Sequence, residues 1–293
     1  MRRLRGPAAL VATAALLLGG IAACSQTPPP DPDITVSGTS GEAPTLTYLT
    51  PLDVSSTYRE QIWPGSGPEL TEDAPVLLDY WIEDATDASL VAESYSTSPR
   101  AATLSEAELG SALYGTLRGQ HVGARLLQVS PRGSGGDTYP TVTVVDVLPT
   151  RAQGEAVTPR DDLPKVSLDE DGAPSLTATG TDPPTDLVVQ PLLRGTGAQV
   201  TASDVITVQY TGFSWTTGEQ FDTTWGRLPV SFALQDASAW EEGLVDQPVG
   251  SQVMLVVPPS YELGATDSEA LAGQTLVFVI DILATGSPDG AAS

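Results

Sequence analysis

Cysteine, histidine and lysine are nearly absent from this chain of 293 residues, which contains one of each: Cys24, His121 and Lys165. A lone cysteine cannot build a disulfide framework. One histidine cannot complete a zinc site, or a set of nucleophile, base and orienting acid. His121 precedes Val122-Gly123 in what reads as a turn, so we expect it at the surface. The sequence therefore predicts neither a metal nor an organic cofactor.

Positive charge is also scarce, because 13 lysines and arginines oppose 37 aspartates and glutamates for a formal net charge of -24. A surface of this sign repels phosphate backbones and anionic lipid headgroups. We therefore expect no nucleic-acid partner and no membrane attachment through the polar surface. Arginine far outnumbers lysine, and with abundant Ala and Gly this is typical of GC-rich bacterial genomes such as those of actinobacteria.

The amino terminus has the pattern of a bacterial secretory signal. Arg2, Arg3 and Arg5 precede an apolar run over residues 8–18, and small residues then lead to Cys24. The run is too short to span a bilayer, and its layout predicts a signal peptide over residues 1–23. We expect cleavage before Cys24 and a lipid on its thiol, which would anchor an exported protein to the outer face of the cell membrane. The alternative is an ordinary signal peptide with a chance cysteine.

An internal repeat sets the domain organisation. Shifting the sequence by 130 residues aligns Ala43-Pro44 with Ala173-Pro174 and Tyr80 with Tyr210, and related matches continue to the end of each copy. A repeat of this length indicates a duplicated globular unit rather than a solenoid. The predicted division has these parts: a lipidated Cys24 with a flexible tether over 24–42, a first copy over 43–150, a linker over 151–172, a second copy over 173–286, and a disordered tail over 287–293.

Each copy follows the same pattern of apolar strands around one short helix. Strands are expected at 76–81, 125–129, 205–210 and 252–257, and helix starts at Ser105 and Ser238, each followed three residues later by Glu as in a capping box. An antiparallel sheet packed over one short helix needs only a single core. The fold class is therefore predicted to be α+β.

A series of short motifs in the second copy points to a family. In chain order these are Tyr-x-Gly from Tyr210, Gly-x-x-Phe-Asp from Gly218 to Asp222, Phe232, Trp-x-x-Gly from Trp240, Pro-Pro-x-Tyr ending at Tyr261, and Leu-Val-Phe ending at Phe278. Each motif alone is weak, but their order and spacing resemble those of FKBP-type peptidyl-prolyl isomerases over about a hundred residues. The first copy resembles a degenerate member.

This resemblance implies two FKBP-like domains and a role for each motif residue. Trp240 would form the floor of a proline pocket, and its walls would be Tyr210, Phe221, Phe232 and Phe278. Asp222 would lie at the rim and polarise the pocket, and Tyr261 would line the flap. The implied partners are proline-containing polypeptides, unfolded or exported, whose folding such a chaperone would assist. The alternative for each aromatic residue is an ordinary place in the core of a small domain.

The second copy also departs from the family pattern. Leu263 stands where the family has a second tyrosine, and Ala237-Ser238-Ala239 replaces the Val-Ile pair that offers a backbone amide. The loop over 265–274 is shortened. The first copy has Val91-Ala92 in place of Phe221-Asp222. We therefore weigh two hypotheses: a lipid-anchored isomerase whose second copy is active but weakened, and a non-catalytic envelope lipoprotein that binds polypeptides or scaffolds a complex.

Overall fold

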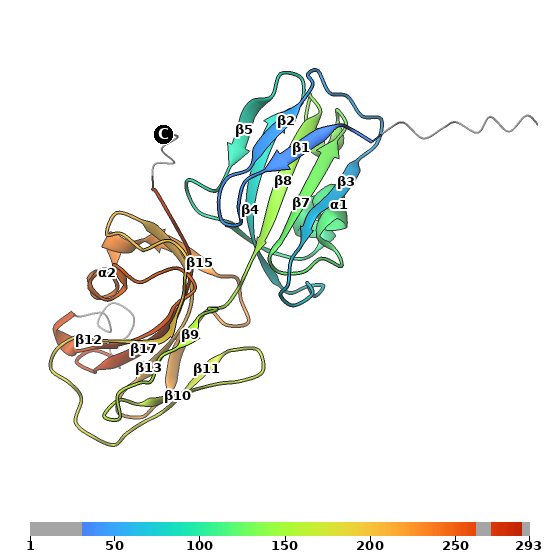
Figure 1. The fold of residues 1–293 in the computed structure, drawn as a ribbon. Coiled ribbons are helices and arrows are strands. Elements are labelled where there is room, and N and C mark those ends of the chain that lie inside the picture. Colours follow the sequence, from blue (N-terminus) through green and yellow to red (C-terminus); the bar gives the residue numbers. More distant parts are fainter. Residues whose placement is uncertain (1–30, 262–270, 289–293) are drawn as a thin grey trace, which may run out of the picture. The chain divides into compact units, whose positions relative to one another are not determined.

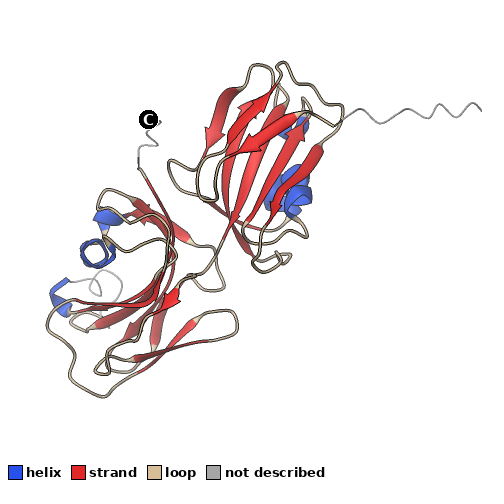
Figure 2. Ribbon diagram, viewed as in Figure 1, coloured by secondary structure: helices blue, strands red, loops and turns tan. Residues whose placement is uncertain are grey.

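The computed structural model describes residues 31–261 and 271–288. The predicted signal peptide, Cys24, Leu263 and most of the predicted tail lie outside these residues. Strands predominate throughout (Figure 2). The described residues contain two α-helices. Among the described residues there is no helix with the length and apolar character that crossing a membrane requires.

The first sheet is antiparallel, with the order β3-β7-β8-β4-β5 and with β6 pairing with β4. Its strands are β3 (Tyr58–Pro64), β4 (Pro75–Asp84), β5 (Ser89–Glu93), β6 (Arg100–Thr103), β7 (Ala124–Ser130) and β8 (Thr141–Leu148). Helix α1 (Glu106–Leu117) precedes β7, and a 3-10 turn, η1 (Ser134–Gly136), precedes β8. Leu109 and Leu117 of α1 pack onto one face of this sheet.

The second sheet is also antiparallel, with the order β14-β13-β17-β16-β12-β9 and with β15 pairing with β13. Its strands are β9 (Glu155–Ala156), β12 (Val188–Arg194), β13 (Val205–Ser214), β14 (Gln220–Thr223), β15 (Val230–Ala233), β16 (Gln252–Val257) and β17 (Leu276–Gly286). The 3-10 turn η2 (Leu234–Asp236) leads into α2 (Ser238–Leu244), and η3 (Pro259–Tyr261) follows β16. Read from β12, the second order is β12-β16-β17-β13-β14, which repeats the order β3-β7-β8-β4-β5 of the first sheet strand for strand. The side strands also correspond, since β15 pairs with β13 as β6 pairs with β4.

Alternating side chains give the second sheet two apolar faces. Leu255 lies in the core under α2, whereas Met254 and Val256 contribute to a cluster on the opposite face. Successive residues of a strand point to opposite faces, so a strand covered on both sides reads as a continuous apolar run. All six residues of β16 are buried, and its observed limits are those expected from the sequence.

A two-stranded hairpin covers the face of each sheet opposite its helix, as Figure 1 shows for β1 and β2. The hairpins are β1 (Ile34–Ser37) with β2 (Thr45–Tyr48), and β10 (Lys165–Leu168) with β11 (Pro174–Thr177). The expectation of a flexible tether was therefore wrong for residues 34–37, which form β1, and the predicted linker contains the strands at 155–156 and 165–168. Alternating apolar residues explain the difference, since Ile34, Val36 and Val166 pack on the sheets.

The two helix starts differ from the expected pair of capping boxes. Ser105 is the N-cap of α1, where its hydroxyl accepts from the Glu108 amide at 3.4 Å, but the Glu108 carboxylate accepts from the Thr103 amide instead of the Ser105 amide. At the second site the prediction was wrong. Helix α2 begins at Ser238 itself, and its N-cap, Ala237, makes no side-chain cap hydrogen bond. The preceding turn η2 ends at Asp236, two residues before this start.

Candidate active site

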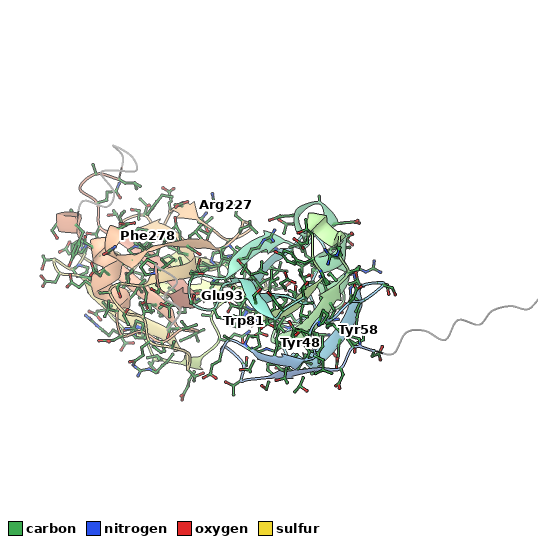
Figure 3. All side chains as sticks on the ribbon, turned by 90° about the horizontal axis from the view of Figure 1, so that it is seen from above. Tyr48, Tyr58, Trp81, Glu93, Arg227 and Phe278 are labelled. Atoms are coloured by element: carbon green, nitrogen blue, oxygen red, sulfur yellow. The ribbon has the colours of Figure 1, made fainter. Side chains whose placement is uncertain are left out.

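Five aromatic residues expected at a pocket converge on the helix-facing side of the second sheet. Trp240 comes from α2, and the other four come from four different strands: Tyr210, Phe221, Phe232 and Phe278. All of them belong to or pack against one apolar cluster. Figure 3 shows Phe278 within the body of this part of the molecule, with Arg227 nearer its surface.

The aromatic rings meet edge to face around Trp240. The Trp240 ring centroid lies 5.2 Å from that of Tyr210, 5.4 Å from Phe232 and 5.4 Å from Phe278. These separations fit the edge-to-face geometry that aromatic quadrupoles favour. Trp240 is 5% exposed and Phe278 is 6% exposed. Both rings are therefore buried at the centre of the cluster, and the roles of Trp240 as pocket floor and of Phe278 as pocket wall stay predictions.

Phe221 reaches the cluster because Gly212 leaves space for it. Phe221 contacts Phe278 edge to face at 5.7 Å between ring centroids. A Cβ placed on Gly212 would lie 2.5 Å from Cζ of Phe221, so any larger residue would displace that ring. Strands β13 and β14 are direct neighbours, and Gly212 lies opposite Asp222 in their pairing. The glycine of the Tyr-x-Gly motif therefore has a packing function.

Asp222 holds a network of donors at the edge of the cluster. The Tyr210 hydroxyl donates to Oδ2 of Asp222, while the Thr223 amide donates to Oδ1 at 2.8 Å. The Arg227 guanidinium lies 3.3 Å from Oδ1, and both partners of this ion pair are partly open to solvent. The carboxylate therefore orients the Tyr210 ring and places negative charge beside an otherwise apolar surface.

Two further residues of this network were not anticipated from the sequence. The Thr224 hydroxyl accepts from the Tyr210 amide at 2.8 Å and so fixes the backbone of the motif tyrosine. Arg227 binds the Asp222 carboxylate, as described above. Signals for both exist in the sequence: the repeat places Ser94 at the position of Thr224, and Arg227 is the only basic residue after Arg194.

Tyr261 belongs to η3 and packs at the margin of the aromatic cluster. Its hydroxyl donates to the Glu242 carboxylate of α2, and this hydrogen bond raises the pKa of the Tyr261 phenol. The tyrosine therefore ties the segment after β16 to the helix. Its expected place beside a flap remains a prediction, because residues 262–270 are outside the described part of the chain.

One backbone amide of residues 237–239, the segment where the family pattern places a donor before the tryptophan, is already engaged. The Ala237 amide donates to the Leu234 carbonyl at 3.1 Å, and the Ala237 carbonyl accepts from the Trp240 amide at 2.9 Å. Among the described residues no group of three or more His, Cys, Asp or Glu side chains could hold a metal ion. The arrangement brings an apolar aromatic cluster and the Asp222 carboxylate together.

Comparison with known proteins places this site in a family. The sequence pattern of the FKBP-type peptidyl-prolyl cis-trans isomerases matches residues 197–283. An FK506-binding protein of Streptomyces anulatus is 33% identical over 118 residues, which are 38% of this chain and 95% of the relative. A probable FK506-binding protein of Corynebacterium glutamicum is 38% identical over 103 residues, which are 34% of this chain and 87% of the relative.

Longer relatives match over only part of their length. The isomerase FkpA of Buchnera aphidicola is 38% identical over 93 residues, covering 31% of this chain and 37% of the relative. The crystal structure of FkpA from Escherichia coli is 30% identical, with a TM-score of 0.33, covering 38% of this chain and 53% of that one. The near-complete coverage of the two shorter relatives decides the assignment, and this chain belongs to the FKBP-type peptidyl-prolyl cis-trans isomerase family.

Proposed function

We propose that the region over residues 173–286 catalyses cis-trans isomerisation of X-Pro bonds in polypeptides. The family relation supports this activity. The observation that carries the proposal is the aromatic cluster around Trp240, with the Asp222 carboxylate bound to the Tyr210 hydroxyl at its edge. An apolar core alone has no use for this acid, because burying part of a carboxylate costs free energy.

The proposed chemistry needs neither a nucleophile nor a cofactor. Amide resonance imposes a barrier of about 18–20 kcal/mol on rotation about the X-Pro bond. The twisted amide at the top of this barrier has lost its resonance and is less polar than the planar one. A surface complementary to that state lowers the barrier because it binds the transition state more tightly than the substrate. The floor made by Trp240 and Phe278 would hold the prolyl ring, with Phe221 and Phe232 beside it.

Asp222 and Tyr210 act together in this proposal. Because Asp222 accepts from the Tyr210 hydroxyl and from the Thr223 amide, its position is fixed before a substrate arrives. Preorganised dipoles of this kind do not have to reorient during the reaction. The proposed role of the carboxylate is to orient Tyr210 and favour the redistribution of charge as the amide twists.

The test is acceleration of a proline-limited refolding reaction by the full chain. Tyr210→Phe removes the hydroxyl that Asp222 holds, and Tyr80→Phe is the matched control at the equivalent place in the first sheet. We expect slower catalysis with the first variant and unchanged catalysis with the second. Equal rates for wild type and Phe221→Ala, with a folded protein, would show that the pocket does not perform the reaction.

A second candidate function is polypeptide binding without catalysis. The observation favouring it is the Ala237 amide, which is engaged with the Leu234 carbonyl, at the place where the family pattern offers a donor to the substrate. In that case, a proline-containing peptide should still shift the fluorescence of Trp240 while the refolding assay shows no acceleration. Phe221→Ala should then abolish the fluorescence shift, and Val91→Ala in the first sheet should leave it unchanged.

We further propose that the chain carries two FKBP-like domains, over 43–150 and 173–286, of which the first is degenerate. The shared strand order of the two sheets and the 130-residue repeat support this division. Strand register places Ala92 opposite Ile82, as it places Asp222 opposite Gly212. The first copy thus lacks the acid, and its proposed role is support or binding. Limited proteolysis tests the division, with cleavage expected near residues 149–151, before β9 joins the second sheet.

The proposed setting is the outer face of a bacterial cell membrane, reached by export and lipid attachment at Cys24. The arginines and apolar run before this cysteine support it. Cleavage there would leave 10 basic and 37 acidic residues and a formal charge of -27. Clients would be exported or envelope proteins that fold through X-Pro isomerisation. Cys24→Ser should release the protein from the membrane fraction, and retention of that variant would exclude the lipid anchor.

A further inference from the structure

The helix-facing side of the first sheet encloses a cavity of about 560 Å³. This is the place that the aromatic cluster fills in the second sheet. Strand register sets Thr143 opposite Ile82 in the first sheet, as it sets Phe278 opposite Gly212 in the second. Replacement of a phenylalanine by a threonine opens the space, and the volume falls in the range of pockets that hold small molecules.

Four polar but uncharged side chains from two strands line the cavity. Neighbouring strands supply Gln128 and Ser130 from β7, and Thr141 and Thr143 from β8. Their counterparts at the same register in the second sheet are Leu255, Val257, Leu276 and Phe278. Four positions that are apolar in the second sheet therefore carry a hydroxyl or an amide in the first sheet. A prolyl ring has no hydrogen-bonding group that could pair with these side chains.

Hydrogen bonds hold one of these polar side chains in place, and others keep hydrogen-bonding capacity for a ligand. The Gln128 amide is fixed at both ends, since its oxygen accepts from Thr116 at 2.6 Å and its nitrogen donates to Ser130 at 2.9 Å. Ser130 therefore accepts one bond and keeps its proton free to donate. Within the described part of the chain, neither the Thr141 nor the Thr143 hydroxyl makes a hydrogen bond, and both side chains line the cavity.

The remaining lining is mostly apolar, but it also includes Tyr80, Ser111 and Ser134 and one side chain of each charge. Ile82, Leu109, Leu113 and Val145 form walls, while Arg100 and Asp137 contribute one charge of each sign. The Arg100 guanidinium already donates to the Glu108 carbonyl at 3.2 Å. The site therefore offers no unbalanced charge to an ionic ligand. It offers hydroxyls that both donate and accept, beside apolar walls.

We propose that this cavity of the first sheet binds a neutral polyhydroxylated molecule of the size of one or two sugar rings. Sugar hydroxyls also donate and accept at the same atom, so they match Ser130, Thr141 and Thr143. The carbon skeleton of the ring would contact Leu113 and its apolar neighbours. The first sheet would then be a small-molecule binding unit whose specificity differs in class from the proline pocket of the second.

Saturation-transfer NMR on the full chain tests this with three neutral probes: glucose, maltose and N-acetylglucosamine. We expect transfer from the protein to the ring protons of at least one sugar. Thr143→Val keeps the side-chain shape and removes one hydroxyl, so affinity should fall by about tenfold, the change expected for one hydrogen bond. Thr143→Phe should fill the cavity and abolish transfer. Thr103→Val, in the same sheet outside the cavity, should bind as wild type.

Three outcomes would overturn the proposal. The first is absence of transfer to all three sugars, and the second is transfer that survives Thr143→Val and Thr143→Phe alike. The third is transfer to a short proline-containing peptide that competes with the sugars and depends on Thr143. A thermal melt of each variant shows whether it is folded, and Thr143→Val remains informative if Thr143→Phe does not fold.

Discussion

The first and second sheets share a strand order and differ in the side chains that face the helix. Register matches Tyr210 with Tyr80, Gly212 with Ile82, Asp222 with Ala92, and Phe278 with Thr143. The tyrosine persists while the glycine, the acid and the phenylalanine change together. Gly212 admits Phe221, and Phe221 packs on Phe278, so these residues form one unit. The comparison shows that the fold tolerates loss of this unit when a helix still covers the sheet.

The buried acids of the two sheets extend the comparison. In the first sheet, Asp146 pairs with the buried Arg125 at 2.6 Å, and Asp79 on the neighbouring strand has no such cation. In the second sheet, Gln252 takes the place of Arg125 and donates to Asp281 at 2.7 Å, while Gln209 takes the place of Asp79. Each sheet therefore keeps one buried carboxyl group without a paired positive charge.

Arg125→Ala should have the largest effect on stability. Arg125 is completely buried and donates to Asp146 and to the Glu42 carbonyl in the loop between β1 and β2. Its loss leaves a buried carboxylate unpaired, which costs about 3–5 kcal/mol. Urea unfolding measures this. Gln252→Ala is the matched control, expected to cost about 1–3 kcal/mol because only a neutral donor is lost. Equal costs would mean that charge does not distinguish the two sites.

Phe278→Thr gives the second sheet the residue that the first sheet has at the same register, Thr143. This substitution should have the second largest effect on stability. Truncating this buried ring is expected to cost about 3 kcal/mol of unfolding free energy. It also removes part of the floor beneath the proposed prolyl site. The refolding assay should show at least a roughly tenfold loss of isomerase activity, equivalent to about 1.4 kcal/mol of transition-state stabilisation. Activity unchanged in a folded variant would separate the floor from catalysis.

Asp79 and Asp281, the two buried acids without a paired positive charge, should make the stability depend on pH. Burial raises the pKa of Asp281 from 3.8 to about 6, and burial likewise raises the pKa of Asp79 to about 6. The folded state therefore binds more protons than the unfolded state between about pH 4 and 6, so the unfolding free energy should fall as pH rises through this window. A shift of two pKa units corresponds to roughly 2–3 kcal/mol per group.

Asparagine substitution of these acids tests the assignment. Asp281→Asn should remove about half of the slope of unfolding free energy against pH between 4 and 6, and the double variant with Asp79→Asn should nearly flatten it. Urea titrations at several pH values measure the slope independently of any constant cost of the amide. A full slope in the double variant would place the titration in other groups. A rise in stability with pH in the wild type would contradict the sign.

Sequence reasoning succeeded where one local pattern decides the outcome. The limits of β16 follow from an apolar run over residues 253–257 that ends at Pro258, and the aromatic cluster follows from the family order of motifs. The hairpins were missed, because β1 and β10 are four-residue strands near proline-rich chain and gain their stability from the sheets they cover. The first-sheet cavity was missed as well. Its polar lining becomes visible only when β7 and β8 are paired in register.

The helix starts give the smallest predicted difference between the two copies. Ser105 accepts from the Glu108 amide at the start of α1, whereas Ser238 lies inside α2 and makes no cap hydrogen bond. Ser105→Ala should therefore destabilise by about 0.5–1 kcal/mol, the lower part of the range for N-caps, because the bond is long. Ser238→Ala should change stability little, since alanine is the better helix former. Urea midpoints of both variants measure this difference, and a larger loss for Ser238→Ala would show that the helix start at residue 238 depends on its hydroxyl after all.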